Sequence, residues 1–392
     1  MALPEKNDGM FDRKKMLTET APGTPMGILL RKFWQPVALS RQVARGAAMP
    51  LRILSEDLTL YRGESGEPHL IGGRCAHRLT LLHTGWVEGE RMRCAYHGWK
   101  YDGTGQCVER PAEKDAGLPD VRVAGYPVRE YCGLIFAYMG EGQAPAFDLP
   151  RKDVFEVKGA PVHARAETWP CHWFQQVENS LDATHVSFVH QLGMPGPFGA
   201  AVTTAIPELS YEETDAGIRQ IATRAENNVR KSDWTFPNNN HIIVPGLRKD
   251  DPWIDIGIWM VPHDEHSTTR FIIYTTPQTG ADAERFMKFF DGITDYNPAD
   301  HHDELFLEKK FPQDPVVQLV SAQDYVATVG QGRVADTIHE TLGRSDLGVM
   351  TLRRIFWREL EAIRSGGATK QWRRLSKPTE LTRQPGAFEA VQ

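Results

Sequence analysis

Long apolar runs, a surplus of positive charge and an abundance of cysteine are all absent from this sequence. Its 392 residues carry a formal net charge of -6 and include only five cysteines, and the mean hydropathy is -0.43. Without a basic surplus, no nucleic-acid partner is expected. Without a run of about 20 apolar residues, no membrane span is expected. The first residues carry charges where a signal peptide needs an apolar core, so the sequence predicts a cytoplasmic protein.

Four of the potential metal ligands form a regular pattern of cysteine and histidine. Cys75 and His77 make one pair, Cys94 and His97 make a second, and 16 residues separate the pairs. A zinc ion would accept two thiolates and two imidazoles. A two-iron cluster would accept them with both cysteines on one iron and both histidines on the other. Because two-Cys, two-His zinc fingers usually place cysteine beside cysteine, the mixed order favours the cluster.

A second group of polar residues lies between residues 169 and 196. Asn179, Asp182 and His185 follow at intervals of three, so on a helix they would spread over about 120° of one face. His190 comes five residues later, a rotation of about 140°, so a bend or the end of the helix should help both rings reach one metal. Two histidines and a carboxylate are the ligands of non-haem Fe(II) sites that activate oxygen. Asp182 is better placed to accept the other ring N–H of His185 than to bind that metal.

The distribution of apolar residues predicts two domains and an α+β fold. Short strand-like runs between Leu51 and Gly142 predict a small antiparallel sheet around the first metal motif. A proline-containing link at residues 145–150 follows it. Alternating runs at residues 254–262 and 268–276 predict a strand hairpin, and the apolar stripe after Asp346 predicts a long helix.

Several of these segments resemble one protein family. RCAHRLTLL, at residues 74–82, and RCAYHGWKYDGTGQC, at residues 93–107, resemble the Rieske segment of bacterial ring-hydroxylating oxygenases. N-x-x-D-x-x-H-x-x-x-x-H, from Asn179 to His190, is similar to their mononuclear-iron motif, and residues 321–354 are similar to the C-terminal part of phthalate-type enzymes. The chain thus resembles the catalytic subunit of a Rieske non-haem iron oxygenase of the phthalate-dioxygenase-like group.

The resemblance implies two cofactors and their ligands. A [2Fe-2S] cluster is expected on Cys75, His77, Cys94 and His97.

A mononuclear Fe(II) is expected on His185 and His190, with Asp182 as the bridge to the cluster and Asn179 near the iron. Asp324 stands where the family's ligand carboxylate is expected.

Two other acids compete for the place of the third iron ligand, and one turn departs from the family pattern. Asp336 lies in a polar run, and Asp346 begins the predicted helix, where its charge would stabilise the first turn. The first half-site of the cluster usually reads close to C-P-H-R-G. Ala76 and Leu79 stand here in place of the proline and the glycine, which bears on the shape of that turn.

The resemblance also implies an architecture. An N-terminal antiparallel β Rieske domain is expected at residues 46–145. A catalytic domain of helix-grip type, with an antiparallel sheet and long helices, is expected at residues 146–376. Residues 1–45 are expected to pack on the catalytic domain, and residues 377–392 are expected to form a loosely ordered tail.

The function implied is hydroxylation of a small aromatic substrate, an aromatic carboxylate or an aryl ether, with O2 and electrons from NAD(P)H. O-demethylation or monooxygenation is the alternative within the family, and a Rieske electron carrier is the alternative from another class. Arg248 and Lys249 could hold a substrate carboxylate, but the adjacent Asp250 and Asp251 favour a solvated loop.

The partners implied are a reductase and further copies of the chain. No G-x-G-x-x-G fingerprint follows a strand, so a separate NAD(P)H-dependent flavin and iron–sulfur reductase is expected. In the family, electrons cross between neighbouring subunits of a trimer. The resemblance therefore implies a homotrimer in which they pass from His97 of one chain through Asp182 to His185 of the next.

Overall fold

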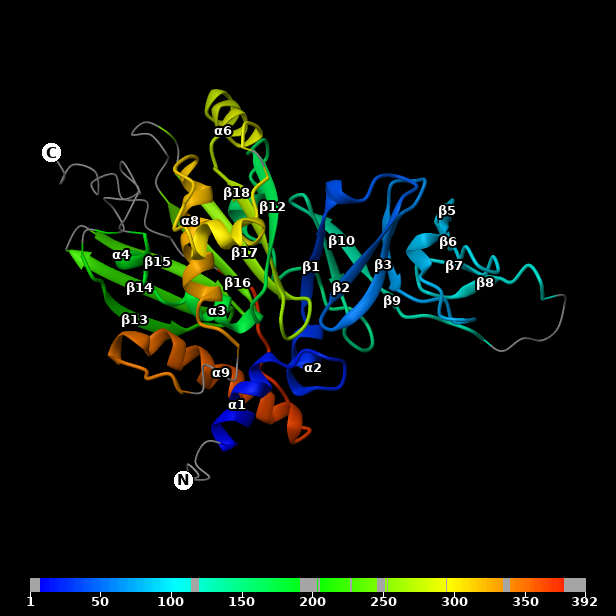
Figure 1. Cartoon of the computed structure of the whole chain (residues 1–392), viewed down its shortest axis with the longest axis horizontal. Coiled ribbons are helices and arrows are strands. Elements are labelled where there is room, and N and C mark those ends of the chain that lie inside the picture. The colour runs from blue at the N-terminus through cyan, green and yellow to red at the C-terminus, as the bar shows by residue number, and fades with distance from the viewer. Residues whose placement is uncertain are drawn as a thin grey trace.

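Two lobes lie side by side in the computed structural model (Figure 1). The structure describes residues 8–113, 120–190, 203, 205–225, 228–244, 251, 253–293, 295–333 and 339–376. Asp336, the Arg248–Lys249 pair and the expected tail at residues 377–392 lie outside the described residues.

The smaller lobe is built from three short antiparallel sheets. The first has the order β2-β3-β4-β9, with strands β2 (Ala48–Ile53), β3 (Glu56–Arg62), β4 (Pro68–Gly72) and β9 (Gly125–Tyr126). The second has the order β5-β6-β7-β8, with strands β5 (Trp86–Glu88), β6 (Arg91–Arg93), β7 (Lys100–Tyr101) and β8 (Cys107–Glu109). The third has the order β1-β11-β10, with strands β1 (Trp34–Leu39), β11 (Leu134–Tyr138) and β10 (Val128–Tyr131). Every residue of β1 is buried, because β1 also contacts the sheet of the larger lobe.

A single antiparallel sheet forms the centre of the larger lobe. Its order is β12-β18-β17-β16-β15-β14-β13. The strands are β12 (Val162–Trp169), β13 (Glu208–Glu213), β14 (Gly217–Ala225), β15 (Asn228–Thr235), β16 (Asn239–Val244), β17 (Ile254–Pro262) and β18 (Thr268–Thr275). The predicted hairpin is confirmed, since β17 and β18 pair along their whole length.

Helices cover this sheet and complete the α+β fold that the sequence predicts. They are α1 (Asp8–Thr18), α2 (Pro25–Arg31), α3 (Trp173–Ser180), α4 (Val186–Val189), α6 (Ala281–Asp291), α7 (His302–Phe306), α8 (Val316–Val329) and α9 (Leu347–Arg364). Short 3₁₀ turns are η1 (Ser40–Gln42), η2 (Leu82–Thr84), η3 (Asp153–Glu156), η4 (Pro298–His301) and η6 (Arg344–Asp346). No helix in the described part of the chain has the length and apolar character needed to cross a membrane.

The longest helix shows how the large core is closed. The side chains of Val349, Leu352, Phe356 and Leu360 are buried along one stripe of α9, as the sequence predicts. The Phe356 ring packs edge-on against Phe174 of α3, with 5.1 Å between ring centroids. This packing fixes α3, and with it the start of the second metal motif, relative to the sheet.

Candidate metal centres

Two turns of the same shape carry the first metal motif. In the first, the Cys75 N–H donates to the Thr80 carbonyl over 2.8 Å, and the Leu79 N–H donates to the Cys75 carbonyl over 2.9 Å. The turn at residues 94–99 repeats both bonds, over 2.8 and 3.1 Å. The fifth residue of each turn lies in the left-handed region, with φ of +62° at Leu79 and +73° at Gly98. The first turn therefore has the same shape as the second, although leucine occupies a position whose left-handed backbone conformation favours glycine.

The cysteine side chains of these turns are buried, and the histidine side chains are more exposed. Cys75 and Cys94 are 3% and 1% exposed, whereas His77 is exposed and His97 is half-buried. The two imidazole rings meet edge-on, with 4.5 Å between centroids. Burial raises the pKa of the Cys94 thiol, and the neighbouring Cys75 thiol raises it further.

This pairing fits a two-iron cluster better than a zinc ion. A thiol pair beside an imidazole pair suits two irons, each with like ligands. The Nδ1 atom of His97 is buried without a hydrogen-bond partner, which is the expected condition of an atom that binds metal.

Two aromatic residues support the cluster turns, and the sequence reasoning did not single them out. The Tyr101 hydroxyl accepts the Ala76 N–H over 3.0 Å and lies 3.2 Å from the Cys75 Sγ atom, to which it can donate. The Trp99 ring stacks on His77, with 4.7 Å between centroids. Hydrogen bonds to cluster sulfur are one of the factors that set a cluster's reduction potential. Both residues belong to the run at residues 93–107, which could have drawn attention to them.

The second motif does not lie on one helix, so the predicted spread of its residues over one helix face is wrong. Helix α3 ends at Ser180, one residue after Asn179. The Asp182 Oδ1 atom then accepts the N–H groups of Thr184, over 2.9 Å, and His185, over 3.3 Å. Such a side-chain bond to the backbone competes with helix continuation, which explains the break. The expected bend thus comes before His185.

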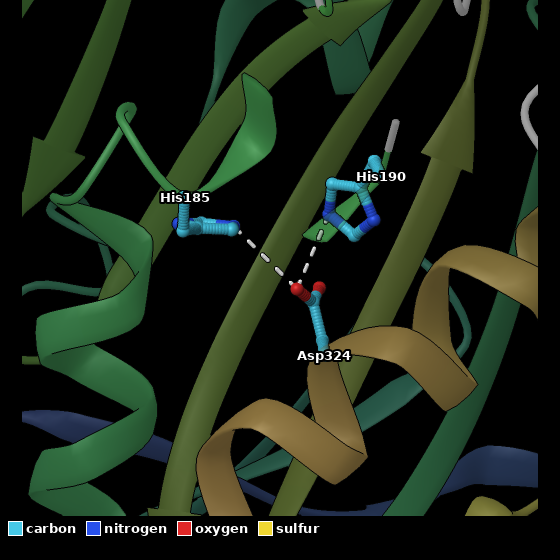
Figure 2. Close-up of side chains that lie close together, drawn as sticks. All are labelled: His185, His190 and Asp324. Carbon is cyan, nitrogen blue, oxygen red and sulfur yellow. Dashed lines mark ion pairs between the residues drawn. The ribbon is translucent and has the colours of Figure 1, made fainter. Parts of the chain in front are cut away.

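The break places the two histidines at opposite ends of a one-turn helix. His185 is the N-cap of α4 and His190 is its C-cap. Both rings point toward Asp324 on α8 (Figure 2). The Asp324 Oδ1 atom lies 3.5 Å from His185 Nε2 and 3.2 Å from His190 Nε2. The ligand atoms of the three residues all lie within 4.8 Å of one another.

The electrostatics of this triad suit a divalent metal ion. Burial would raise the pKa of Asp324, but His190 and His185 outweigh it and hold the pKa well below its usual range. The carboxyl group is therefore an anion, although it is only 7% exposed. The Asp324 Oδ1 atom faces the Nε2 atoms of both imidazoles. One carboxylate and two imidazoles with open positions beyond them form the ligand set of non-haem Fe(II) oxygenases.

A residue that sequence reasoning missed orients one of these rings. The Gln323 Oε1 atom lies 2.9 Å from the Nδ1 atom of His190, inside the protein. If His190 donates that N–H, its Nε2 lone pair is directed to the side of Asp324, as in metal-ligating histidines generally. Its position directly before Asp324, a candidate iron ligand, could have drawn attention to Gln323.

The remaining predicted residues lie as follows. Asn179 and Asp182 line the same cavity as the triad. The Asp182 Oδ2 atom is 3.9 Å from the His185 Nδ1 atom, so the expected hydrogen bond between them is not formed within this chain. Asp346 is the N-cap of α9, and its Oδ2 atom accepts the Gly343 N–H over 2.5 Å. The structure thus brings Asp324, and not Asp346, to the two histidines.

A cavity of about 140 Å³ adjoins the triad. A cavity of about 150 Å³ holds benzene in another protein, so one aromatic ring fits here. The sheet contributes one wall, with apolar side chains from Ile242, Val244, Ile258 and Met260. The opposite wall comes from α3, α4 and α8, and the triad lies at the two ends of α4 and on α8.

Comparisons with known proteins agree with this geometry. Residues 33–129 match the family model of the Rieske [2Fe-2S] domain. The 5,5'-dehydrodivanillate O-demethylase oxygenase subunit of Sphingobium sp. (strain SYK-6) is 30% identical, over 100% of this chain and 86% of that protein. The phenoxybenzoate dioxygenase subunit alpha of Ectopseudomonas oleovorans is 34% identical, over 90% of this chain and 85% of that protein.

A solved structure shares the fold. The terminal oxygenase of carbazole 1,9a-dioxygenase from Novosphingobium sp. KA1 aligns with a TM-score of 0.64 at 19% identity, over 88% of this chain and 94% of that one.

Proposed function

We propose that this chain hydroxylates a small aromatic substrate. It belongs to the catalytic subunits of the Rieske non-haem iron oxygenases, in the phthalate-dioxygenase-like group. The chain is an oxidoreductase that uses a [2Fe-2S] cluster and a mononuclear non-haem iron. It is the oxygenase component of a multicomponent system, which implies O2 and a reductase. The observation that supports the active site most directly is the His185, His190 and Asp324 triad beside a ring-sized cavity.

In this proposal each metal centre has its own ligands. Cys75 and Cys94 hold one iron of the cluster, and His77 and His97 hold the other. His185, His190 and Asp324 hold the mononuclear iron. When bound, the cluster supplies stored electrons and the iron supplies oxygen activation.

The side chains around the triad position the reaction. Gln323 holds the Nδ1 N–H of His190, so the ring cannot rotate or change tautomer freely. The apolar wall formed by Ile242, Val244, Ile258 and Met260 binds the flat face of a ring and keeps water from the reacting carbon.

The electron route in this proposal runs between neighbouring subunits of a homotrimer, from His97 to Asp182 to His185 of the next chain. Two observations support it. The two imidazoles lie on the small lobe, where His77 is exposed and the exposed Tyr96 ring lies 3.9 Å from the His97 ring between centroids. The Asp182 Oδ2 atom makes no hydrogen bond within the described residues, so it is available to a neighbour. The separate NAD(P)H-dependent reductase, the domain limits and the cytoplasmic location stay predictions.

O-demethylation of an aryl ether is the second candidate, because a relative of 30% identity over the whole chain is named as an O-demethylase. Both reactions use the same metal set, and the substrate held in the cavity decides between them.

Iron content and oxygen uptake test the proposal. The purified protein is expected to be reddish-brown and to contain about three irons per chain. With an NADH-dependent reductase, it should consume O2 with members of a panel of aromatic carboxylates and aryl ethers. Labelled O2 separates the candidates, because dioxygenation places two labelled oxygens in the product and O-demethylation releases formaldehyde. About two irons per chain and no uptake with any compound would indicate an electron carrier instead.

A further inference from the structure

Two arginines of the cavity wall have no acidic partner. Arg224 lies on β14 and Arg230 on β15, and both line the cavity beside the triad. Arg224 donates from Nε to the Ala205 carbonyl over 3.1 Å and from Nη2 to the Ala183 carbonyl over 3.4 Å. Arg230 donates from Nη2 to the Ile243 carbonyl over 2.9 Å. Among the described residues, no carboxylate pairs with either guanidinium.

Arg224 and Arg230 reach the cavity from neighbouring strands of the sheet. Ala222 of β14 lies opposite Arg230 of β15. The register shifts between Thr223 and Ala225, so Arg224 lies at an irregularity of β14, and its place in the cavity lining is what puts it beside Ala222 and Arg230. Ala222 lines the cavity as well. The two cations therefore lie on neighbouring strands of one wall.

Within the part of the chain that the structure describes, no acidic side chain compensates the positive charge of these two groups. Burial lowers the pKa of both guanidinium groups, and the charge of Arg224 contributes to a pKa of about 10 at Arg230. Both groups remain protonated at neutral pH. Two half-buried cations side by side disfavour each other unless an anion joins them.

Two other arginines near the cavity have partners of other kinds, although the Arg270 Nε atom is buried without a hydrogen-bond partner among the described residues. Arg219, on the same strand as Arg224, pairs with Asp233 over 3.2 Å and with Glu212 over 3.6 Å. Arg270, which also lines the cavity, has its guanidinium carbon 4.3 Å from the centroid of the Trp169 ring. Arg224 and Arg230 differ from both.

The hydrogen-bond capacity of the pair matches a carboxylate. A guanidinium has five N–H donors. The bonds above occupy two atoms of Arg224 and one of Arg230, so donors remain on both side chains. Arginine binds planar carboxylates through paired hydrogen bonds, and the cavity has room for one ring.

We propose that Arg224 and Arg230 form the subsite that binds a carboxylate group of the substrate, which is a single-ring aromatic acid. The ring then lies along the apolar wall, between the arginines and the triad. This inference rests on the proposed function, and it assigns the substrate's charge to residues that the sequence reasoning passed over. The sequence reasoning considered Arg248 and Lys249 for a substrate carboxylate but favoured a solvated loop there, and both lie outside the described residues.

Equilibrium binding tests the subsite without turnover. Titration calorimetry on the oxidised protein would compare benzoate with benzamide and 3-methoxybenzoate with 3-methoxybenzamide, because each pair differs in charge and hardly in shape. We expect the wild-type protein to bind the acids at least ~10-fold more tightly than the amides. Arg224→Gln and Arg230→Gln should each weaken binding of the acids ~10- to 100-fold and change binding of the amides less than ~3-fold.

Matched variants separate the subsite from a structural role. Arg230→Lys keeps the positive charge but loses the planar guanidinium that donates two parallel hydrogen bonds. It should therefore bind the acids more tightly than Arg230→Gln does, and less tightly than the wild-type protein. Arg219→Gln removes the same charge from the same strand, but at a paired residue, and should leave the preference for the acids unchanged. An iron content of about three per chain, which includes the mononuclear iron of the larger lobe, confirms that each variant is folded.

The outcomes distinguish this inference from the proposed function. Equal affinity for acids and amides, or an equal loss in Arg219→Gln, would overturn the subsite. Oxygen uptake with neutral aromatic compounds and no preference for acids would also overturn it, while leaving the oxygenase activity standing. Tight, arginine-dependent binding of acids without oxygen uptake from any compound would support the subsite and contradict the proposed function.

Discussion

The two metal-binding regions differ in how the chain brings their ligands together. All four proposed cluster ligands lie within residues 75–97, on two turns of the same hydrogen-bonded shape. The proposed iron ligands come from both ends of α4 and from α8, so Asp324 reaches the histidines only through the packing of the larger lobe. The first site depends on local backbone geometry, and the second depends on tertiary structure.

They also differ in exposure, and the difference matches their proposed roles. His77 is exposed and the neighbouring His97 is half-buried. This exposure suits an electron-transfer centre, because such a centre must be reached by the proteins that give and take its electrons. His190 and Asp324 are 4% and 7% exposed, which suits a centre where water competes with the substrate. Because the regions are built independently, damage to one should leave the other loaded.

The largest expected effect is the loss of one centre at a time. Asp324→Asn removes the only anionic ligand of the triad, so affinity for the mononuclear iron should fall more than ~100-fold and turnover should cease. The cluster's visible absorbance should persist, with about two irons per chain. Cys75→Ser should do the reverse and abolish the visible absorbance. Iron analysis and absorbance spectra measure both, and a variant that loses both centres would show that the regions are not independent.

The next effect concerns the connection between the regions. Asp182→Asn keeps an oxygen that can accept the N–H groups of Thr184 and His185, so the turn should persist. If Asp182 carries electrons between the centres, steady-state turnover should fall at least ~100-fold while both metals remain bound. Stopped-flow reoxidation of the reduced cluster would locate the block. Normal turnover by the Asp182→Asn variant would show that Asp182 does not carry electrons between the two centres.

A smaller effect is expected at Gln323, which belongs to the tertiary site alone. Gln323→Leu leaves the His190 Nδ1 atom without its partner, so affinity for the mononuclear iron should fall ~10- to 100-fold. Gln323→Glu keeps an acceptor and should lose less. Competition with a chelator measures the affinity, and the cluster spectrum serves as the internal control. Equal iron affinity in wild type and Gln323→Leu would show that packing alone orients His190.

The same contrast explains what the sequence could predict. The family, the α+β fold, the strand hairpin and the cofactors followed from short motifs and from apolar periodicity, and the relatives and the structure confirm them. The single helix through Asn179 and His185 was wrong, because helical spacing does not reveal that the Asp182 side chain would bond to the backbone and end the helix.

Contacts between distant segments were beyond the sequence. Arg224 and Arg230 carry no motif, and only the folded structure reveals that both line the cavity and that no carboxylate among the described residues pairs with either. Which residues bind the metals stays a prediction, although the geometry supports it.

The smallest effect compares the two cluster turns with each other. Leu79 has a left-handed backbone and a side chain that is 63% exposed, so Leu79→Gly removes strain and little packing. A left-handed residue other than glycine costs about 1–2 kcal/mol, and glycine's greater freedom in the unfolded chain offsets about 0.4–1 kcal/mol. Leu79→Gly should therefore raise the free energy of unfolding by about 0 to 1.6 kcal/mol.

Gly98 provides the opposite test, since an added Cβ atom there would lie 3.1 Å from Pro111 Cγ at a φ of +73°. Gly98→Leu should lower the free energy of unfolding by about 1–2 kcal/mol or more. Denaturant unfolding, followed by the cluster's absorbance, measures both changes. If Leu79→Gly is instead destabilising by more than about 1 kcal/mol, then the exposed leucine packs against another surface. The outward face of the cluster turns would then be a contact between subunits, which would support the proposed trimer.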